Sequence, residues 1–359
     1  MEEIVIEARS ALRAPLEVRP ARQRLTGAGG KRRWAGLLVL LGVVALAVLL
    51  SIALGSKPLT PGQVWHGLWS PQGLEADIIV RDLRLPRTWL GLVAGAALGV
   101  AGALMQGHTR NPIADPVVLG ISAGAGMCVV AAVFLLGISG LHGYVWFGFL
   151  GAAVASLLVH AVGRLARGGA TPVTLALAGA AAHALFTALT AGIVLIDRQA
   201  LEVYRFWTVG TLSGRPVELV VQMLPFVLVG LVLAAANAGG LNALSLGEDV
   251  ARSLGLRVGL TRAVGMAAIT VLTGTAVAVC GPIGFAGLVS THIARYFTGP
   301  DYRWILVYSG LIGASLVVLA DTLGRLVARP GELQVGIMLA LIGAPVFIYL
   351  VSRRKPVGP

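Results

Sequence analysis

The stretch GLVAGAALGVAGALMQGHTRNPIADPVVLGISAGAG runs from Gly91 to Gly126 and joins two apolar, glycine-rich segments through a polar one. Its glycines at 91, 95 and 99 recur every fourth residue, so they share one face of a helix. Small residues at this spacing let helix backbones approach closely inside a membrane. Lipid cannot satisfy the polar segment, 106–115, so we expect it to line a cavity or a water-facing edge, or to be an ordinary loop between membrane helices.

The composition of the chain indicates a membrane protein. Of its 359 residues, 57% are hydrophobic and only 12% are charged, whereas a soluble domain carries about 25% charged residues. Long uncharged apolar runs recur from one end to the other, and the length suits about ten spans of about 20 residues. The sequence therefore predicts an all-α polytopic membrane protein with about ten transmembrane helices and no separate soluble domain. The expected spans are roughly 34–54, 89–107, 117–136, 144–162, 172–196, 220–236, 263–279, a short one that ends near 293, 305–320 and 335–351.

The basic residues indicate how these spans are oriented. The formal net charge is +12, which in a soluble protein would suggest nucleic acid, but here the positive residues crowd both ends and certain short loops. Cytoplasmic loops carry the excess of Lys and Arg in membrane proteins. We therefore expect a multi-pass protein of the cell (inner) membrane, with both termini in the cytoplasm and with no nucleic-acid partner.

The two ends of the chain frame one domain. Residues 1–33 are polar and strongly basic, which predicts a cytoplasmic, largely disordered tail that touches anionic lipid and is not a signal peptide. Residues 34–355 are expected to form a single transmembrane domain. Cys128 and Cys280 sit inside apolar runs, so we expect them to pack between helices and not to form a disulfide.

The sequence carries no motif for covalent chemistry. Its six histidines show no metal-ligand spacing, and no nucleophile elbow or zinc motif appears. None of the lysines follows a GxxxxGK[ST] loop, so if ATP drives this protein, the ATPase is another chain. We expect no enzyme activity, no bound metal and no cofactor in this chain.

A cytoplasmic loop is expected at 237–261, and it contains the segment ALSLGEDVARSLGL at 243–256. Glu248 and Asp249 suit the positive end of a helix, and Gly255 suits its termination. The segment therefore predicts a short amphipathic helix exposed to the cytoplasm. Such a helix docks in the groove of a partner protein or lies on the lipid headgroups, and the sequence does not separate the two.

Arginines on the outer side oppose the usual charge bias. Arg84 and Arg87 flank a Leu-Pro pair at the mouth of the second span, and Arg325 is expected in a polar outer loop with Asp321 and Glu332. A rigid guanidinium fork suits the carboxylates of a docking partner. The alternative is that these side chains simply reach the lipid headgroups.

Four stretches together resemble the FecCD (vitamin B12, ferric siderophore and haem) permeases of type II ABC importers, over essentially everything after Trp34. The first is RLPR at 84–87, which leads into GAALGVAGALMQ and RNPIADPVVLG, and the second is ALSLGEDVARSLGL. The third is GPIGFAGLVSTHIAR at 281–295. The fourth is Ala-Asp at 320–321, then Arg325, then GELQVGIMLALIGAPVFIYL. The stretches occur in order and at matching separations.

The resemblance implies the type II ABC importer permease fold, with two permease subunits, identical or related, around a central path. It implies that a substrate-binding protein on the outer side docks on Arg84, Arg87 and Arg325. It also implies two ATPase subunits in the cytoplasm, where ATP and Mg act. The residues that would couple to them are Gly247, Glu248, Asp249, Arg252, Leu254 and Gly255.

The resemblance further places Asn111 and Ile113 at the cytoplasmic gate. With the outer arginines at one end and the gate at the other, the stretch 91–126 is expected to span the membrane along the transport path. Its small residues would then give a wide, weakly binding lining for a large chelate.

The function implied by the resemblance is the permease subunit of an ATP-driven importer of ferric siderophores, with haem or vitamin B12 as the alternative. A second class, a secondary transporter driven by an ion gradient, requires carboxylates inside the membrane. Asp115 and Asp321 are its nearest candidates. A third class, a receptor or structural membrane protein, would leave the cytoplasmic loop without a partner.

Overall fold

The computed structural model describes residues 28–138, 140–165 and 172–352, and the regular elements within these ranges are helices. Most of the predicted tail, 1–33, lies outside the described residues, but residues 28–33 are helical and begin the first long helix. The helices, with π-helical turns labelled η, are α2 (Ala28–Ala53), α3 (Pro61–Trp69), α4 (Glu75–Ile78), η1 (Ile79–Arg84), α5 (Leu85–Thr109), η2 (Val117–Ile121), α6 (Ser122–Leu136), α7 (Leu141–Leu165), α8 (Pro172–Ile196), α9 (Arg198–Trp207), α10 (Val217–Ser245), α11 (Glu248–Ser253), α12 (Val258–Cys280), α13 (Ala286–Thr298), α14 (Tyr302–Val327) and α15 (Val335–Ser352).

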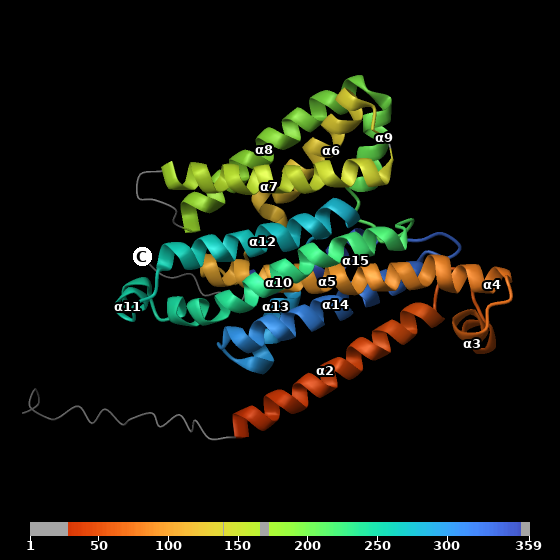
Figure 1. Cartoon of the computed structure of the whole chain (residues 1–359), viewed down its shortest axis with the longest axis horizontal. Coiled ribbons are helices and arrows are strands. Elements are labelled where there is room, and N and C mark those ends of the chain that lie inside the picture. The colour runs from red at the N-terminus through yellow and green to blue at the C-terminus, as the bar shows by residue number, and fades with distance from the viewer. Residues whose placement is uncertain (1–27, 139, 166–171, 353–359) are drawn as a thin grey trace, which may run out of the picture.

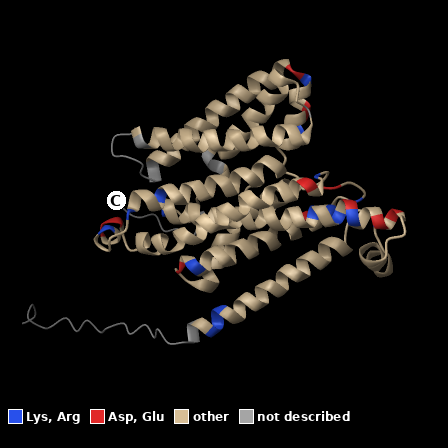
Figure 2. Ribbon diagram, viewed as in Figure 1, with Lys and Arg blue, Asp and Glu red and all other residues tan. Residues whose placement is uncertain are grey.

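Charged residues gather at two opposite ends of the helical bundle and leave its middle uncharged (Figure 2). Seven of the described helices are long and apolar enough to cross a membrane, and α6 and α15 are shorter apolar helices. Each predicted span coincides with a helix, but α13 has 13 residues. At about 1.5 Å per residue it is too short to cross about 30 Å of hydrocarbon. The all-α polytopic membrane fold is confirmed, while the number of ten transmembrane helices stays a prediction.

Helix α5 runs through the middle of the bundle and packs against α10, α12, α13 and α14 (Figure 1). A Cβ atom at Gly95 would lie 2.4 Å from the carbonyl oxygen of Gly313, and one at Gly99 would lie 2.1 Å from that of Ser309, both on α14. The predicted close approach of helix backbones is therefore confirmed. Gly95 and Gly99 themselves face α14, which fills the face that they form, and the prediction that the stretch 91–126 lines the transport path stays a prediction.

A second group of helices, α6 to α9, lies along one side of this central group (Figure 1). Helix α7 joins the two groups by packing against α12. Helix α8 packs on α6, α7 and α9, and its outward face is apolar and uncovered. The exposed leucines on that face include Leu177, Leu185, Leu189 and Leu195.

The cytoplasmic connection predicted at 237–261 is shorter than expected. Helix α10 continues into it from one side and α12 from the other, which leaves 246–257 as the connection. Asn237 is accommodated inside α10 because its side-chain amide donates to the carbonyl oxygen of Thr261 at 2.7 Å. Asn237, which looked like the first residue of a loop, thus makes a contact between α10 and α12.

The outer loop predicted around Asp321 and Arg325 is also helical. Helix α14 continues through both residues, and both side chains are buried. The connection to α15 therefore begins only after α14 ends, and it contains Glu332. This difference decides how the outer charged residues are arranged.

Candidate functional site

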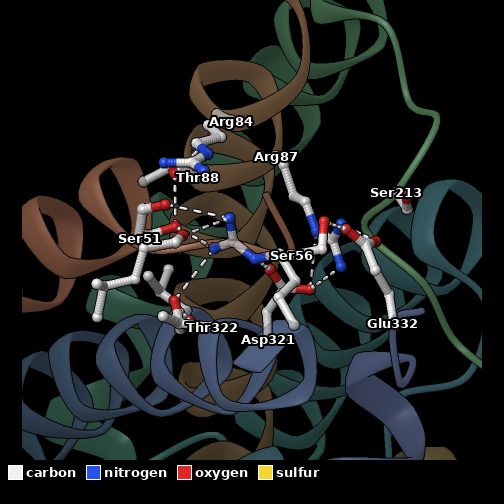
Figure 3. Close-up of polar contacts among 12 residues, drawn as sticks. Ser51, Ser56, Arg84, Arg87, Thr88, Ser213, Asp321, Thr322 and Glu332 are labelled. Atoms are coloured by element: carbon white, nitrogen blue, oxygen red, sulfur yellow. Dashed lines mark hydrogen bonds and ion pairs between the residues drawn. The ribbon is translucent and has the colours of Figure 1, made fainter. Parts of the chain in front are cut away.

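The three predicted docking arginines lie together at the end of the bundle that the sequence predicts to be outside: Figure 3 shows Arg84 and Arg87 beside Asp321, with which Arg325 also pairs. Arg84 ends η1, Arg87 lies in the first turn of α5, and Arg325 lies in the last turn of α14. With Asp321 and Glu332 they form what we call the outer arginine cluster. The structure buries all three arginines, which expose 4%, 6% and 3% of their surface respectively. Burial of a charge is costly unless the charge is paired and hydrogen-bonded.

Two carboxylates hold Arg87. Its Nε and Nη2 donate to Oδ1 of Asp321 at 2.9 and 2.8 Å, and its Nη1 donates to Oε2 of Glu332 at 2.6 Å. Burial acts to raise the pKa of Glu332, but the hydrogen bond and the charge of Arg87 outweigh it, so the pKa lies below its ordinary value. Arg87 thus joins α5 to α14 and to the connection that precedes α15.

Arg84 and Arg325 close the C-terminal end of α2. The last carbonyl groups of a helix have no partner within it. Nη1 of Arg84 donates to the carbonyl oxygen of Ile52 at 2.7 Å, and Arg325 donates to the carbonyl oxygen of Ser51 at 3.1 Å and to its hydroxyl at 2.8 Å. Nε of Arg325 also lies 3.2 Å from Oδ2 of Asp321. These acceptors allow the burial of the two arginines.

The outer arginine cluster, taken together with Arg329, carries more positive than negative charge. Arg329 adds to the cluster by donating to the carbonyl oxygen of Gly55 at 2.7 Å. Four arginines then face two carboxylates, because the other partners of Arg84 and Arg329 are neutral carbonyl groups. About two of the positive charges on these four arginines are left without a carboxylate.

The predicted gate residues, Asn111 and Ile113, follow the inner end of α5 and line a cavity of about 290 Å³. Helix α5 ends at Thr109, and the next residue, Arg110, adopts the left-handed conformation with a φ of 50°. Oδ1 of Asn111 then accepts a hydrogen bond from the backbone N–H of Ile113 at 3.2 Å. Phe285 and Phe347 also line this cavity. Of the two interpretations of the polar segment, the one that has it lining a cavity is confirmed.

Asp115, in the same segment as the predicted gate residues, lines this cavity together with Phe285 and Leu288 at the start of α13. Its Oδ1 accepts a hydrogen bond from the backbone N–H of Val117 at 2.8 Å. Burial raises the pKa of Asp115 to about 6, although the backbone N–H groups of Val117, Phe285 and Leu288 act in the opposite direction. Asp321, the other carboxylate considered for an ion-driven transporter, is paired with Arg87 and Arg325.

The predicted coupling residues form a short helix, α11, at the inner end of the bundle (Figure 1). It begins after Gly247, whose φ of 119° is accessible mainly to glycine, and it is followed by Gly255, with a φ of 81°. Glu248 pairs with Arg252 at 2.7 Å and with Arg262 of α12 at 2.8 Å. The expected helix and its glycine boundaries are confirmed.

One side of α11 is buried and the other is exposed and partly apolar. Ala251 packs against α10 and α12, whereas Leu246, Val250 and Leu254 expose 64%, 45% and 67% of their surface. Asp249 is fully exposed beside them. The predicted amphipathic character is therefore confirmed. An exposed apolar patch with a polar rim is typical of an interaction site.

Comparison with known proteins decides the family. A model described as the FecCD transport family matches residues 36–353 of this chain. The chain belongs to this family. It is 45% identical over 324 residues to the ferric enterobactin transport system permease protein FepD of Escherichia coli (strain K12), with 90% of this chain and 96% of that protein covered. It is 41% identical over 321 residues to the "Probable siderophore transport system permease protein YfiZ" of Bacillus subtilis (strain 168), with 89% and 96% covered.

The fold of this FecCD chain also has a counterpart among solved structures. It superposes on the solved structure described as "An inward-facing conformation of a putative metal-chelate type ABC transporter" with a TM-score of 0.76 and 27% sequence identity. The match covers 89% of this chain and 99% of that one. The predicted family and permease fold are therefore confirmed, and the chain is a multi-pass membrane permease subunit.

Two side chains of this FecCD permease join the end of α5 to α10, the helix that precedes α11. Nη2 of Arg110 donates to the carbonyl oxygen of Leu244, near the end of α10, at 2.9 Å. Nε2 of His108 lies 2.9 Å from Oδ1 of Asn237. Sequence reasoning missed both contacts because the partners are 134 and 129 residues apart and no motif links them.

The described part of the chain offers no cluster of three or more His, Cys, Asp or Glu side chains that could hold a metal ion. Cys128 on α6 and Cys280 on α12 are free thiols within the helical bundle. Their positions agree with the predicted packing role.

Proposed function

We propose that this FecCD permease is the membrane subunit of an ATP-driven importer of ferric siderophores. The observation that carries the proposal is its 45% identity to a ferric enterobactin permease over 90% of the chain. The gate cavity and the exposed coupling helix, both at the inner end, fit a subunit that opens and closes a path in response to a cytoplasmic partner. Haem or vitamin B12 is the alternative substrate.

The transport path runs along α8 and α15. Both helices reach the gate cavity near their inner ends, through Leu175 and Phe347. Helix α8 also leaves His183 and Thr187 exposed in the middle of an apolar helix, where lipid would not satisfy them. A second permease subunit, identical or related, that faces these helices would enclose the path and supply a polar or water-filled environment.

Two ATPase subunits bind from the cytoplasm, one on the α11 of each permease subunit. Both termini of this permease lie on the same, cytoplasmic side of the cell (inner) membrane. Leu254 and its exposed apolar neighbours supply the contact area, and Glu248 fixes α11 to α12 through Arg262. A displacement of α11 is therefore transmitted to α12. It is also transmitted to the gate segment, through the hydrogen bond between Arg110 and Leu244. ATP and Mg act in the ATPase subunits and are not bound by this chain.

A substrate-binding protein on the outer side docks on the outer arginine cluster. Arg84, Arg87 and Arg325 are paired internally, so acidic groups on the docking protein respond to the uncompensated positive charge of the whole cluster. Such long-range attraction between the cluster and a docking protein weakens as salt rises. Glu332, at the exposed edge of the cluster, lies where an incoming carboxylate would compete for Arg87.

The substrate assignment is tested by uptake from a panel of chelates. Cells that lack a chelate permease would express this chain with its ATPase and binding protein and receive ferric siderophores, haem or cobalamin. Uptake of iron from a ferric siderophore, with none of haem or cobalamin, supports the proposal. Uptake of haem or cobalamin without uptake of any ferric siderophore would refute the siderophore assignment.

A further inference from the structure

An apolar groove opens on the face of the bundle between α5, α10 and α14. Its volume is about 760 Å³, within the range of about 300–1,000 Å³ that small-molecule sites occupy. Arg303, at one end, is the one charged residue among those that line it. The groove is open because α10 presents small side chains there: Ala234, Ala235, Ala236, Ala238 and Gly239.

The groove occupies the inner half of the membrane. On α14 its wall runs from Arg303, in the first turn, to Leu311. The rise over this stretch is about 12 Å at about 1.5 Å per residue, and half of the hydrocarbon core is about 15 Å thick. With the inner ends of the helices in the cytoplasm, as the basic residues indicate, Arg303 lies at the depth of the inner-leaflet headgroups.

Arg303 lacks an anionic partner within the part of the chain that the structure describes. The nearby carboxylate of Asp301 pairs with Arg33 at 3.6 Å and accepts a hydrogen bond from Asn242 at 2.9 Å. On the other side, Arg295 donates to the hydroxyl of Tyr302. Arg303 is exposed, and its guanidinium is free to bind a phosphate, for which its planar fork is well suited.

We propose that this groove binds an anionic phospholipid of the inner leaflet, with the lipid phosphate on Arg303 and one acyl chain between α10 and α14. The charge at one end and the apolar walls along the rest match the two parts of such a lipid. The bound lipid would fill the space that α10 leaves against α5 and α14. Helix α10 is followed directly by α11. The site is separate from the docking, gate and coupling residues, and it does not depend on which chelate is transported.

Native mass spectrometry of the purified permease, with phosphatidylglycerol or phosphatidylcholine added singly, tests this site. The wild type is expected to bind phosphatidylglycerol more tightly than phosphatidylcholine. Arg303→Gln is expected to weaken phosphatidylglycerol binding about fivefold, the effect of removing one cation near an anionic headgroup. Gly239→Leu, whose added Cβ meets open space, is expected to weaken binding of both lipids by filling the groove.

The matched control is Arg257→Gln, which removes an exposed arginine that does not line the groove, and it is expected to change neither affinity. Equal binding of the two lipids by the wild type would overturn the proposal. So would an Arg303→Gln variant that matches the Arg257→Gln control. A Gly239→Leu variant that keeps both lipids but loses its second permease subunit would assign the groove to a protein neighbour, and would overturn it as well.

Discussion

Replacement of Asp321 by Asn tests whether the outer arginine cluster holds the helices together. Asp321 accepts two N–H groups of Arg87, at 2.9 and 2.8 Å, and its other oxygen lies 3.2 Å from Nε of Arg325. The substitution keeps the shape of the side chain but leaves two buried guanidinium groups without their shared counter-charge. Removal of one partner of a buried ion pair costs about 3–5 kcal/mol. Because the Asn oxygen still accepts a hydrogen bond, we expect a loss near the lower end, about 3 kcal/mol.

The assay is the free energy of unfolding of the purified permease, measured by denaturant titration in mixed micelles. The matched control is Asp249→Asn on α11, where a fully exposed carboxylate lies 3.8 Å from Arg252. Exposed pairs of this kind contribute little to stability, so no measurable change is expected. If Asp321→Asn lowers the free energy of unfolding no more than this control does, the reasoning about the cluster is refuted.

Three further substitutions have defined outcomes. Gly99→Leu should lower the free energy of unfolding by about 1–3 kcal/mol or more, because its Cβ would lie 2.1 Å from the carbonyl oxygen of Ser309, whereas Gly42→Leu, which meets open space, should not. Leu254→Asp should weaken ATPase binding at least about tenfold in a pull-down without unfolding the permease, since it removes an exposed apolar contact; unchanged binding would exclude α11 as the coupling surface. The ionised Glu332 stabilises the folded wild type, and Glu332→Gln should remove this contribution. The contribution is fully present at a pH above 4.5, the ordinary carboxyl pKa, and it is lost as the pH falls through the lowered pKa of the folded state. The stability difference between these two proteins should therefore vanish in acid, and a difference that grew in acid would contradict the sign of the shift.

The membrane helices could be predicted because apolar runs are read directly from the sequence. The spacing of Gly95 and Gly99 also predicted a close helix contact correctly. The pattern did not say which helix would fill that face, since small residues mark a close approach and not the identity of the neighbour. The pattern alone therefore did not reveal that Gly95 and Gly99 face α14.

The sequence also did not reveal the partners of the outer arginine cluster. Arg84 and Arg325 were expected at the surface because polar segments surround them, but the free carbonyl groups at the end of α2, including that of Ser51, accept their N–H groups. Nothing in the sequence around Ser51 marks it as the partner of Arg325. The coupling helix was predictable because Gly247 and Gly255 set its boundaries locally.

The central claim is that this FecCD permease imports a chelate at the expense of ATP. Its most direct test is uptake of a ferric siderophore, presented by its binding protein, into proteoliposomes that contain this chain and its ATPase subunits. The account predicts accumulation that requires ATP on the ATPase side and that continues when proton and sodium gradients are abolished. Accumulation without ATPase or ATP, driven by an imposed ion gradient, would contradict it.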